Sequence, residues 1–405
     1  MQRIAFVGLF GLAGALVLLQ LSVQTAVPST SLEPSTDRAG GCVAHYHPSA
    51  DYFPGKARIR RATGFTLEYR KHYKVLTVLT PWPGARERFR YVLVHCGTPQ
   101  PSGFDDAQRI EVPIATIAVL SPTHLPHLER LGELDRLVGI SDRDLVYSAR
   151  ARARIADASV KVVGRGANLN IESLLALAPD LVTAVGHDQP QYNAHPVLQR
   201  AGIHVAINSE YIEATPLGRA EWLKFTAAFF NKEADAEQVF DDLARRYEAY
   251  AAKARQIPVQ HRPTVFGGTL FRDTWHVPGG ESFVAQLIED AGGVYLWAED
   301  THRAAVPLNF EMVLDRAAHA AYWFIGRSEW FTQAEMLAEN ERYASFKAFR
   351  SGNVYNSNAR VNRQGANDFW ETAILEPHML LADLIKILHP DLLPDHQLRY
   401  YRRLE

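Results

Sequence analysis

The sequence is poor in cysteine, in net charge and in the short motifs of common hydrolases. Its 405 residues include two cysteines, and 45 acidic side chains nearly balance 43 Lys and Arg side chains, which gives a formal net charge of −2. The basic residues are scattered along the chain, so we expect no broad cationic face of the kind that neutralises phosphates. No nucleic-acid partner is therefore expected.

Neither G-x-S-x-G nor H-E-x-x-H occurs, so two frequent hydrolase signatures are missing. "PGGES" at residues 278–282 lacks the Walker lysine and the Rossmann glycine spacing, and it predicts a tight turn. We expect no catalytic residue and no enzyme activity. A secreted hydrolase stays a weaker alternative, because paired carboxylates can lie far apart in a chain. A structural adhesion module is a third possibility.

Long apolar runs are absent except at the start of the chain. Arg3 precedes an apolar run from Ile4 to about Leu21, followed by small and polar residues. This layout predicts a secretory signal peptide over residues 1–26. A run of this length could instead anchor the chain in a membrane. Both interpretations place the body of the protein in the periplasm or elsewhere outside the cytoplasm.

The two cysteines, Cys42 and Cys96, flank a β-rich stretch. In an oxidising compartment such a pair can form a disulfide that stabilises by roughly 2 to 4 kcal/mol. "RAGGC" before Cys42 has the small residues of a lipid-attachment box, but it lies about 20 residues beyond the apolar run instead of directly after it. We therefore expect a Cys42–Cys96 disulfide.

Composition and periodicity divide the remaining chain, which is long enough for more than one core. Residues 27–41 are rich in Ser, Thr and Pro and predict a flexible linker. Alternating β-branched and aromatic residues in 42–111, interrupted by "PGARE", predict a β-rich extension with a hairpin that frames the first lobe. From 112 to 217 short apolar strands alternate with amphipathic helices, which favours a parallel sheet.

The second half repeats this alternation after one helical stretch. Residues 218–257 have apolar positions at helical spacing and lack proline as far as Ile257, so they predict one long interlobe helix. Residues 258–405 then predict a second α/β lobe.

A matched glutamate occurs in each lobe. "NLNIESLLALAPDLV" contains Glu172 and "LNFEMVLDRA" contains Glu311, and the two glutamates are 139 residues apart. Asn170 and Asn309 are good helix N-caps, and an acidic residue in a first turn favours the helix dipole by roughly 0.3 to 1 kcal/mol. A structural role is therefore an alternative for either glutamate taken alone.

The chain resembles the periplasmic binding proteins of ABC importers for ferric siderophores, haem or cobalamin. "LSPTHLPHLERLGELDRLVGIS", "NLNIESLLALAPDLV", the long helix, "VPGGESFVAQLIEDAGG" and "LNFEMVLDRA" follow one another in the order typical of that family. The resemblance implies two Rossmann-like α/β lobes with parallel sheets, joined by one long helix. It also implies that Glu172 and Glu311 dock against arginines of a permease dimer in the membrane. Residues 43–110 are longer than the usual N-terminus of the family.

Ligands of open α/β sheets bind beyond the carboxyl ends of the strands. The corresponding loops supply aromatic and cationic side chains that could hold a large anionic chelate. The candidate ligand-binding residues are Ser121, Thr123, His124, His187, Tyr211, Phe271, Arg272, Trp275, Arg327, Trp330 and Arg360, with Trp370 at the start of a late helix.

We therefore expect a monomeric solute receptor that captures a metal chelate and delivers it to the permease. A ferric siderophore ranks before cobalamin or haem because the candidate loops carry several arginines. No resident cofactor and no protein-bound metal site are expected. Direct capture of bare zinc, manganese or iron by histidines is the alternative, although the histidines are dispersed along the chain. The histidines considered for it are His124, His127, His187 and His276.

Overall fold

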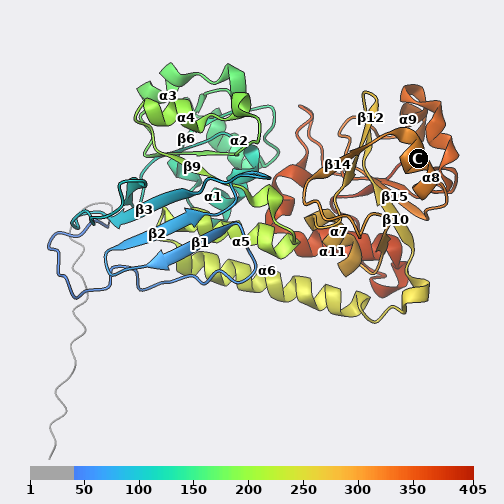
Figure 1. Ribbon diagram of the computed structural model, residues 1–405, viewed down its shortest axis with the longest axis horizontal. Helices are drawn as coiled ribbons and strands as arrows, with labels where there is room; N and C mark the ends of the chain where they lie inside the picture. Colours follow the sequence, from blue (N-terminus) through green and yellow to red (C-terminus); the bar gives the residue numbers. More distant parts are fainter. Residues whose placement is uncertain (1–40) are drawn as a thin grey trace, which may run out of the picture. The chain divides into compact units, whose positions relative to one another are not determined.

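The computed structural model describes residues 41–405, which form an N-terminal sheet and two α/β lobes (Figure 1). The predicted signal peptide and nearly all of the predicted linker lie outside the described residues. Within the described range, no helix combines the length and apolar character needed to cross a membrane.

The N-terminal sheet contains the predicted hairpin. The strands are β1 (Phe65–Tyr69), β2 (Tyr73–Val78), β3 (Phe89–His95) and β4 (Gln108–Val112). β1, β2 and β3 pair antiparallel, with "PGARE" between β2 and β3, and β4 runs parallel to β3. Cys42 and Cys96 form a disulfide, as predicted. The bridge also leaves no Cys42 thiol for a lipid.

The first lobe is built on a parallel sheet in the order β7-β6-β5-β8-β9. Chain order reverses between β5 and β8, which makes the gap between their carboxyl ends the topological switch point. The strands are β5 (Ile117–Val119), β6 (Leu137–Ile140), β7 (Lys161–Val162), β8 (Leu181–Ala184) and β9 (Val205–Ile207), and the helices are α1 (Leu125–Leu131), α2 (Ala149–Ala156), α3 (Ile171–Leu177) and α4 (His195–Arg200).

The second lobe has a sheet in the order β13-β10-β15-β16-β17, parallel except for β17. A small antiparallel sheet, β11-β12-β14, adjoins it. The strands are β10 (Thr264–Gly267), β11 (Thr269–Phe271), β12 (Thr274–Pro278), β13 (Val294–Tyr295), β14 (Ala305–Leu308), β15 (Tyr322–Ile325), β16 (Val354–Asn356) and β17 (Arg402–Arg403). The helices are α7 (Phe283–Asp290), α8 (Phe310–Ala317), α9 (Gln333–Glu339), α10 (Lys347–Arg350) and α11 (Pro377–Leu388).

The prediction of one interlobe helix over 218–257 is wrong. The structure has two helices, α5 (Pro216–Ala228) and α6 (Glu233–Ala254), separated by a break in which Asn231 takes φ 55°. Asparagine tolerates this left-handed conformation better than most residues. Lys74 on β2 lies fully buried at the break and donates from Nζ to Ala228 O at 2.6 Å, with a further bond to Asn231 Oδ1 at 2.8 Å.

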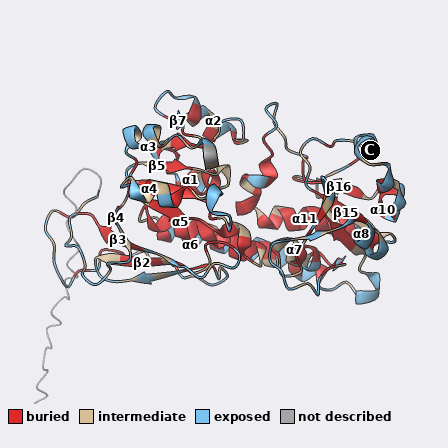
Figure 2. Cartoon of the chain, turned by 45° about the horizontal axis from the view of Figure 1, so that its top comes forward, coloured by how far each residue is buried: buried red, intermediate tan, exposed pale blue. Residues whose placement is uncertain are grey.

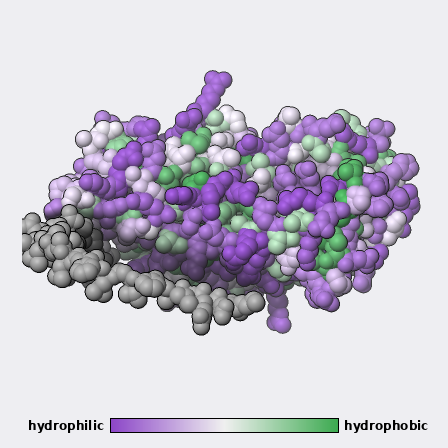
Figure 3. Space-filling model, turned by 90° about the horizontal axis from the view of Figure 1, so that it is seen from below, coloured by the Kyte–Doolittle hydropathy of each residue, from purple (hydrophilic) through white to green (hydrophobic). Residues whose placement is uncertain are grey.

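The two helices play different parts between the lobes. All residues of α5 are buried, and the helix packs against α1 on one side and α7 on the other (Figure 2). α6 is amphipathic, packs on α5 and α11, and with 22 residues spans about 33 Å. The face of the molecule seen from below, on the α6 side of Figure 1, is mainly hydrophilic (Figure 3).

The N-terminal extension is bound to α5 by two buried carboxylates. Glu221 accepts backbone N–H bonds from Arg60, Arg61 and Ala62 at 2.6 to 3.0 Å. Glu213, just before α5, accepts those of Thr63 and Gly64 at 2.8 to 3.0 Å in the same way. The extension is therefore part of the first lobe's structure. It also shares a hydrophobic core with the lobe, since Phe65 packs against Trp222 of α5.

A third buried carboxylate joins the lobes. Glu371 of the second lobe accepts N–H bonds from Tyr147 at 2.6 Å and from Ser148 at 3.0 Å, both in the first lobe. Asn362 Nδ2 donates to Val146 O at 3.0 Å nearby. Burial raises the pKa of Glu371 to about 7, against the effect of the two N–H donors, and the Asp368 and Glu129 carboxylates add to the rise. We call this set of bonds the interlobe junction.

Removal of the Glu221 carboxylate should destabilise the protein strongly. Glu221→Ala leaves three backbone donors without their acceptor and removes one of the two carboxylates that pair with the buried Lys224 ammonium, so we expect a loss of about 3 to 5 kcal/mol in the free energy of unfolding. Urea denaturation measures it. The matched control is Glu248→Ala, which breaks an exposed pair with Arg61 and should cost no more than about 1 kcal/mol. Equal losses in the two variants would contradict the role of Glu221.

The interlobe junction should weaken as pH rises. The pKa of Glu371 is about 7 when the lobes are joined and returns toward its ordinary value near 4.5 when they part, so the joined state holds the proton more tightly. Its stabilisation is complete below the ordinary pKa and is lost as pH rises through about 7. Fluorescence energy transfer between labels on cysteines at exposed Ala158 and Glu299 should therefore fall from pH 5 to pH 8. Glu371→Gln cannot titrate, and a pH response that persists in it would refute this assignment.

Candidate functional site

A cavity of about 630 Å³ lies at the switch point of the first lobe. Ser121 follows β5 and His187 follows β8, and both line the cavity together with Arg165 and Tyr192. Ser121 Oγ lies 2.9 Å from Thr123 Oγ1, and partial burial lowers the pKa of His187. Two sequence-predicted residues are thus brought together here, with Thr123 beside them.

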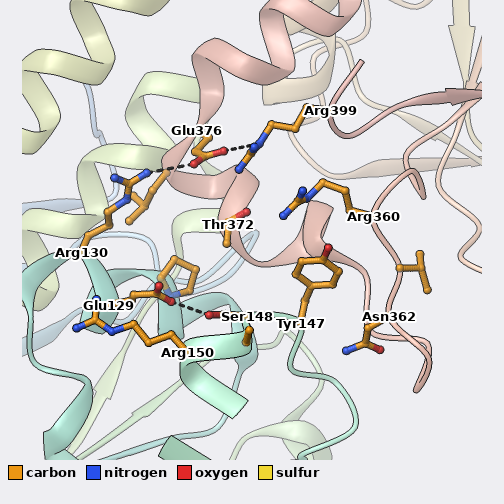
Figure 4. A pocket seen from close by; sticks show the side chains of 14 residues that line it. Glu129, Arg130, Tyr147, Ser148, Arg150, Arg360, Asn362, Thr372, Glu376 and Arg399 are labelled. Carbon is orange, nitrogen blue, oxygen red and sulfur yellow. Dashed lines mark hydrogen bonds and ion pairs between the residues drawn. The ribbon is translucent and has the colours of Figure 1, made fainter. Parts of the chain in front are cut away.

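A second cavity, of about 880 Å³, lies between the lobes (Figure 4). We call it the interlobe cavity. The end of α1 and the segment that leads into α2 form its first-lobe wall, and the loop after β16, the start of α11 and the C-terminal tail form its second-lobe wall. The lining residues are Pro126, Glu129, Arg130, Tyr147, Ser148, Ala149, Arg150, Arg360, Val361, Asn362, Thr372, Leu375, Glu376 and Arg399.

The interlobe cavity is rich in arginine. Glu376 lies between two guanidinium groups, with Oε1 at 3.2 Å from Arg130 Nη2 and Oε2 at 2.8 Å from Arg399 Nε. Arg360 donates from Nε to Asp368 Oδ2 at 2.6 Å, and its guanidinium carbon lies 5.1 Å from the centre of the Tyr147 ring. The cavity can therefore offer several N–H donors to an anionic ligand.

Sequence reasoning found one of these arginines. Arg360 was expected because it follows β16, a parallel strand. Arg130, Arg150 and Arg399 were missed: the first lies on a helix, the second begins one, and the third is carried by the tail that ends in β17. No local motif marks any of the three.

Two tryptophans predicted as walls of a ligand site lie in the core of the second lobe. Trp275 is fully buried, stacks on Trp323 and donates from Nε1 to Gly267 O at 3.1 Å. Trp330 is 3% exposed and packs edge-on against Tyr343. Neither ring presents a face to a cavity, because alternation along β12 and packing under α9 turn both inward. The expectation of flat tryptophan walls is therefore wrong.

The remaining predicted ligand residues are dispersed. Phe271, Arg272 and Trp370 are exposed and do not line the interlobe cavity. Arg327 pairs with Glu329 at 2.7 Å and Glu339 at 3.2 Å and does not line the interlobe cavity. Tyr211 donates its hydroxyl to Gly186 O at 2.8 Å beside the switch-point cavity, and burial raises its pKa to about 12.

The histidines considered for a bare metal ion are not assembled into one site. His124 and His127 are fully buried, each with Nδ1 on a threonine hydroxyl, and burial lowers both pKa values to about 3. His187 lies at the switch point, and His276 is exposed on β12. Among residues 41–405, the single group of three close ligand atoms is Cys42, Cys96 and Glu111, whose sulfurs are bonded to each other.

The positions of Glu172 and Glu311 fit both the docking interpretation and the structural interpretation. Each is exposed in the first turn of a helix, α3 and α8, and the preceding asparagine caps the helix: Asn170 Oδ1 accepts from Ser173 N and Asn309 Oδ1 from Met312 N, both at 2.8 Å. Glu311 also pairs with Arg342 at 3.2 Å, yet 73% of its side chain is exposed. Both carboxylates can be reached from solvent.

Comparison with known proteins agrees with this architecture. An uncharacterized lipoprotein of Methanocaldococcus jannaschii is 25% identical over 71% of this chain and 68% of its own. Among solved structures, Helicobacter pylori CeuE with Ni(II) bound has a TM-score of 0.54 and 20% identity, and covers 72% of this chain and 88% of its own. A periplasmic heme binding protein from Pseudomonas aeruginosa has a TM-score of 0.52 and 18% identity over 72% and 98%.

The similar structures confirm the predicted two-lobed α/β fold, and a match to a family of periplasmic proteins confirms the predicted extracytoplasmic location. Residues 117–361, more than half of the chain, match the family described as periplasmic binding protein. The match begins with β5 and ends in the loop after β16, so it spans the core of both lobes. The chain belongs to the periplasmic binding protein family.

Proposed function

We propose that this protein is the exported solute-binding component of an ABC importer, and that it captures a metal chelate between its lobes and passes it to a membrane permease. The observation that carries the proposal is the interlobe cavity, which takes residues from both lobes and has the volume of a small-molecule site. Four arginines line it, which favours an anionic ferric siderophore over haem or cobalamin.

The family supports a role in binding and transport. The solved structures that this chain is similar to include one with Ni(II) bound and one described as heme binding. The two exposed glutamates support delivery to a permease, because a rim carboxylate that meets an arginine gives bidentate geometry and fast, salt-dependent encounter. Capture of a bare metal ion is the second candidate; it rests on the histidines alone, and the described ones are separated.

A ligand panel tests the cargo class. Quenching of tryptophan fluorescence is measured with ferric siderophores, haem, cobalamin, and bare zinc, manganese and iron ions. We expect saturable binding of at least one ferric siderophore, with weaker binding of haem and cobalamin. Binding of a bare ion without any chelate would favour the second candidate, and a protein that binds nothing in the panel would refute chelate capture.

A double variant tests docking. Glu172→Ala with Glu311→Ala should leave chelate affinity unchanged and abolish uptake in cells that carry the cognate importer, because each carboxylate supplies one of two contacts with the permease. Exposed Glu68 and Glu299, both changed to alanine, form the matched control and should keep transport. Normal uptake by the Glu172→Ala, Glu311→Ala variant would refute docking. The two glutamates would then have a purely structural role in the first turns of α3 and α8.

A further inference from the structure

Two arginines of the interlobe cavity, Arg360 and Arg399, are each held in place by a carboxylate. Asp368 is fully buried; its Oδ2 accepts from Arg360 Nε at 2.6 Å, and its Oδ1 accepts from Thr372 Oγ1 at 2.7 Å. Glu376 accepts from Tyr400 Oη at 2.6 Å and forms an ion pair with Arg399, with Oε2 at 2.8 Å from Nε. Arg360 is thus held by a hydrogen bond and Arg399 by an ion pair.

The two anchors lie next to each other. Thr372, which donates its hydroxyl to Asp368, has Oγ1 at 3.0 Å from the hydroxyl of Tyr400, which donates to Glu376. Figure 4 draws Arg360 and Arg399 on the same wall of the cavity. We call these two side chains the arginine pair. The terminal N–H groups of the two guanidinium groups can donate to an anion that enters the cavity.

The tail that carries Arg399 is itself fixed. β17 pairs antiparallel with β16, with Asn356 opposite Arg402, and this pairing returns the tail to the loop that holds Arg360. Fully buried Asp383 accepts the backbone N–H groups of Arg399, Tyr400 and Tyr401 at 2.6 to 3.1 Å. Arg399 lies beyond the residues that match the family. The arginine pair therefore depends on a segment outside the family match.

The lining also restricts the shape of the ligand. Among residues 41–405, Tyr147 is the only aromatic residue that lines the interlobe cavity, and Arg360 lies over its ring. A flat macrocycle is held best by stacking on several aromatic faces, and this lining has one. The lining carries four guanidinium groups and two carboxylates, so its own charge is positive. Arginine forks match the geometry of carboxylate oxygens.

We propose that the arginine pair binds a carboxylate group of the cargo, so that the cargo is a carboxylate-bearing, anionic metal chelate and not a flat macrocycle or a neutral chelate. This inference rests on the proposed function and specifies its ligand. The terminal N–H groups of Arg360 and Arg399 donate to the carboxylate, while Asp368 and Glu376 keep both guanidinium groups in place. First-lobe Arg130 and Arg150 complete the basic lining from the opposite wall.

Calorimetric titration tests the inference with iron(III) citrate, a neutral ferric trihydroxamate, haem and citrate without metal. We expect iron(III) citrate to bind in a salt-dependent manner. Arg360→Met and Arg399→Met should each lower its affinity at least tenfold, about 1.4 kcal/mol. Arg360→Lys keeps the positive charge beside Asp368 but lacks the fork, and it should fall between wild type and Arg360→Met. Exposed Arg245→Met on α6 is the matched control and should not change the affinity.

The outcomes separate this inference from the proposed function. If the neutral trihydroxamate or haem binds and iron(III) citrate does not, the carboxylate class is wrong while chelate capture stands. Unchanged iron(III) citrate affinity in folded Arg360→Lys and Arg399→Met would overturn the arginine pair as its site. Citrate that binds as tightly as its iron complex would show that the pair holds a free anion and not the cargo. A folded wild-type protein that binds no chelate would refute both.

Discussion

Buried carboxylates that accept consecutive backbone N–H groups hold the parts of this molecule together. Glu221 and Glu213 bind residues 60–64 to α5, Glu371 binds the first lobe to the second, and Asp383 binds the C-terminal tail. Each is at most 2% exposed. A buried carboxyl group is costly unless its oxygens are hydrogen-bonded, and each of these four accepts at least two backbone N–H groups. These contacts therefore fix segments that lack strand or helix bonds of their own.

Sequence patterns predicted the elements that depend on local periodicity. The hairpin around "PGARE", the alternation of strands and helices in both lobes and the N-caps Asn170 and Asn309 all follow from residues close together in the chain. The break between α5 and α6 does not. Apolar spacing continues through it, and the group that stabilises it is Lys74, about 150 residues earlier. Tertiary contacts determine where the helix breaks, so helical periodicity alone could not predict the break.

The candidate site could be predicted only in part, because some of its residues are placed by tertiary contacts and not by local sequence patterns. Ser121, His187 and Arg360 were found because each follows a parallel strand, and the carboxyl ends of such strands are where ligands bind. Trp275 was misplaced because its segment forms the small antiparallel sheet and not a loop of the crevice. Arg399 was missed because its position depends on β17 pairing with β16 and on Asp383, neither of which has a sequence signature.

The interlobe junction and the interlobe cavity are built from the same two segments. Residues 146–150 give backbone groups to the junction and the side chains of Tyr147, Ser148 and Arg150 to the cavity. Residues 360–376 of the second lobe give the side chains of Asn362 and Glu371 to the junction and the side chain of Arg360 to the cavity. A ligand shifts a conformational equilibrium only by its differential affinity for the two states. A ligand bound as proposed, against both walls, would have such a difference for any state in which the junction is open. Binding and the junction would then be coupled through the residues that they share.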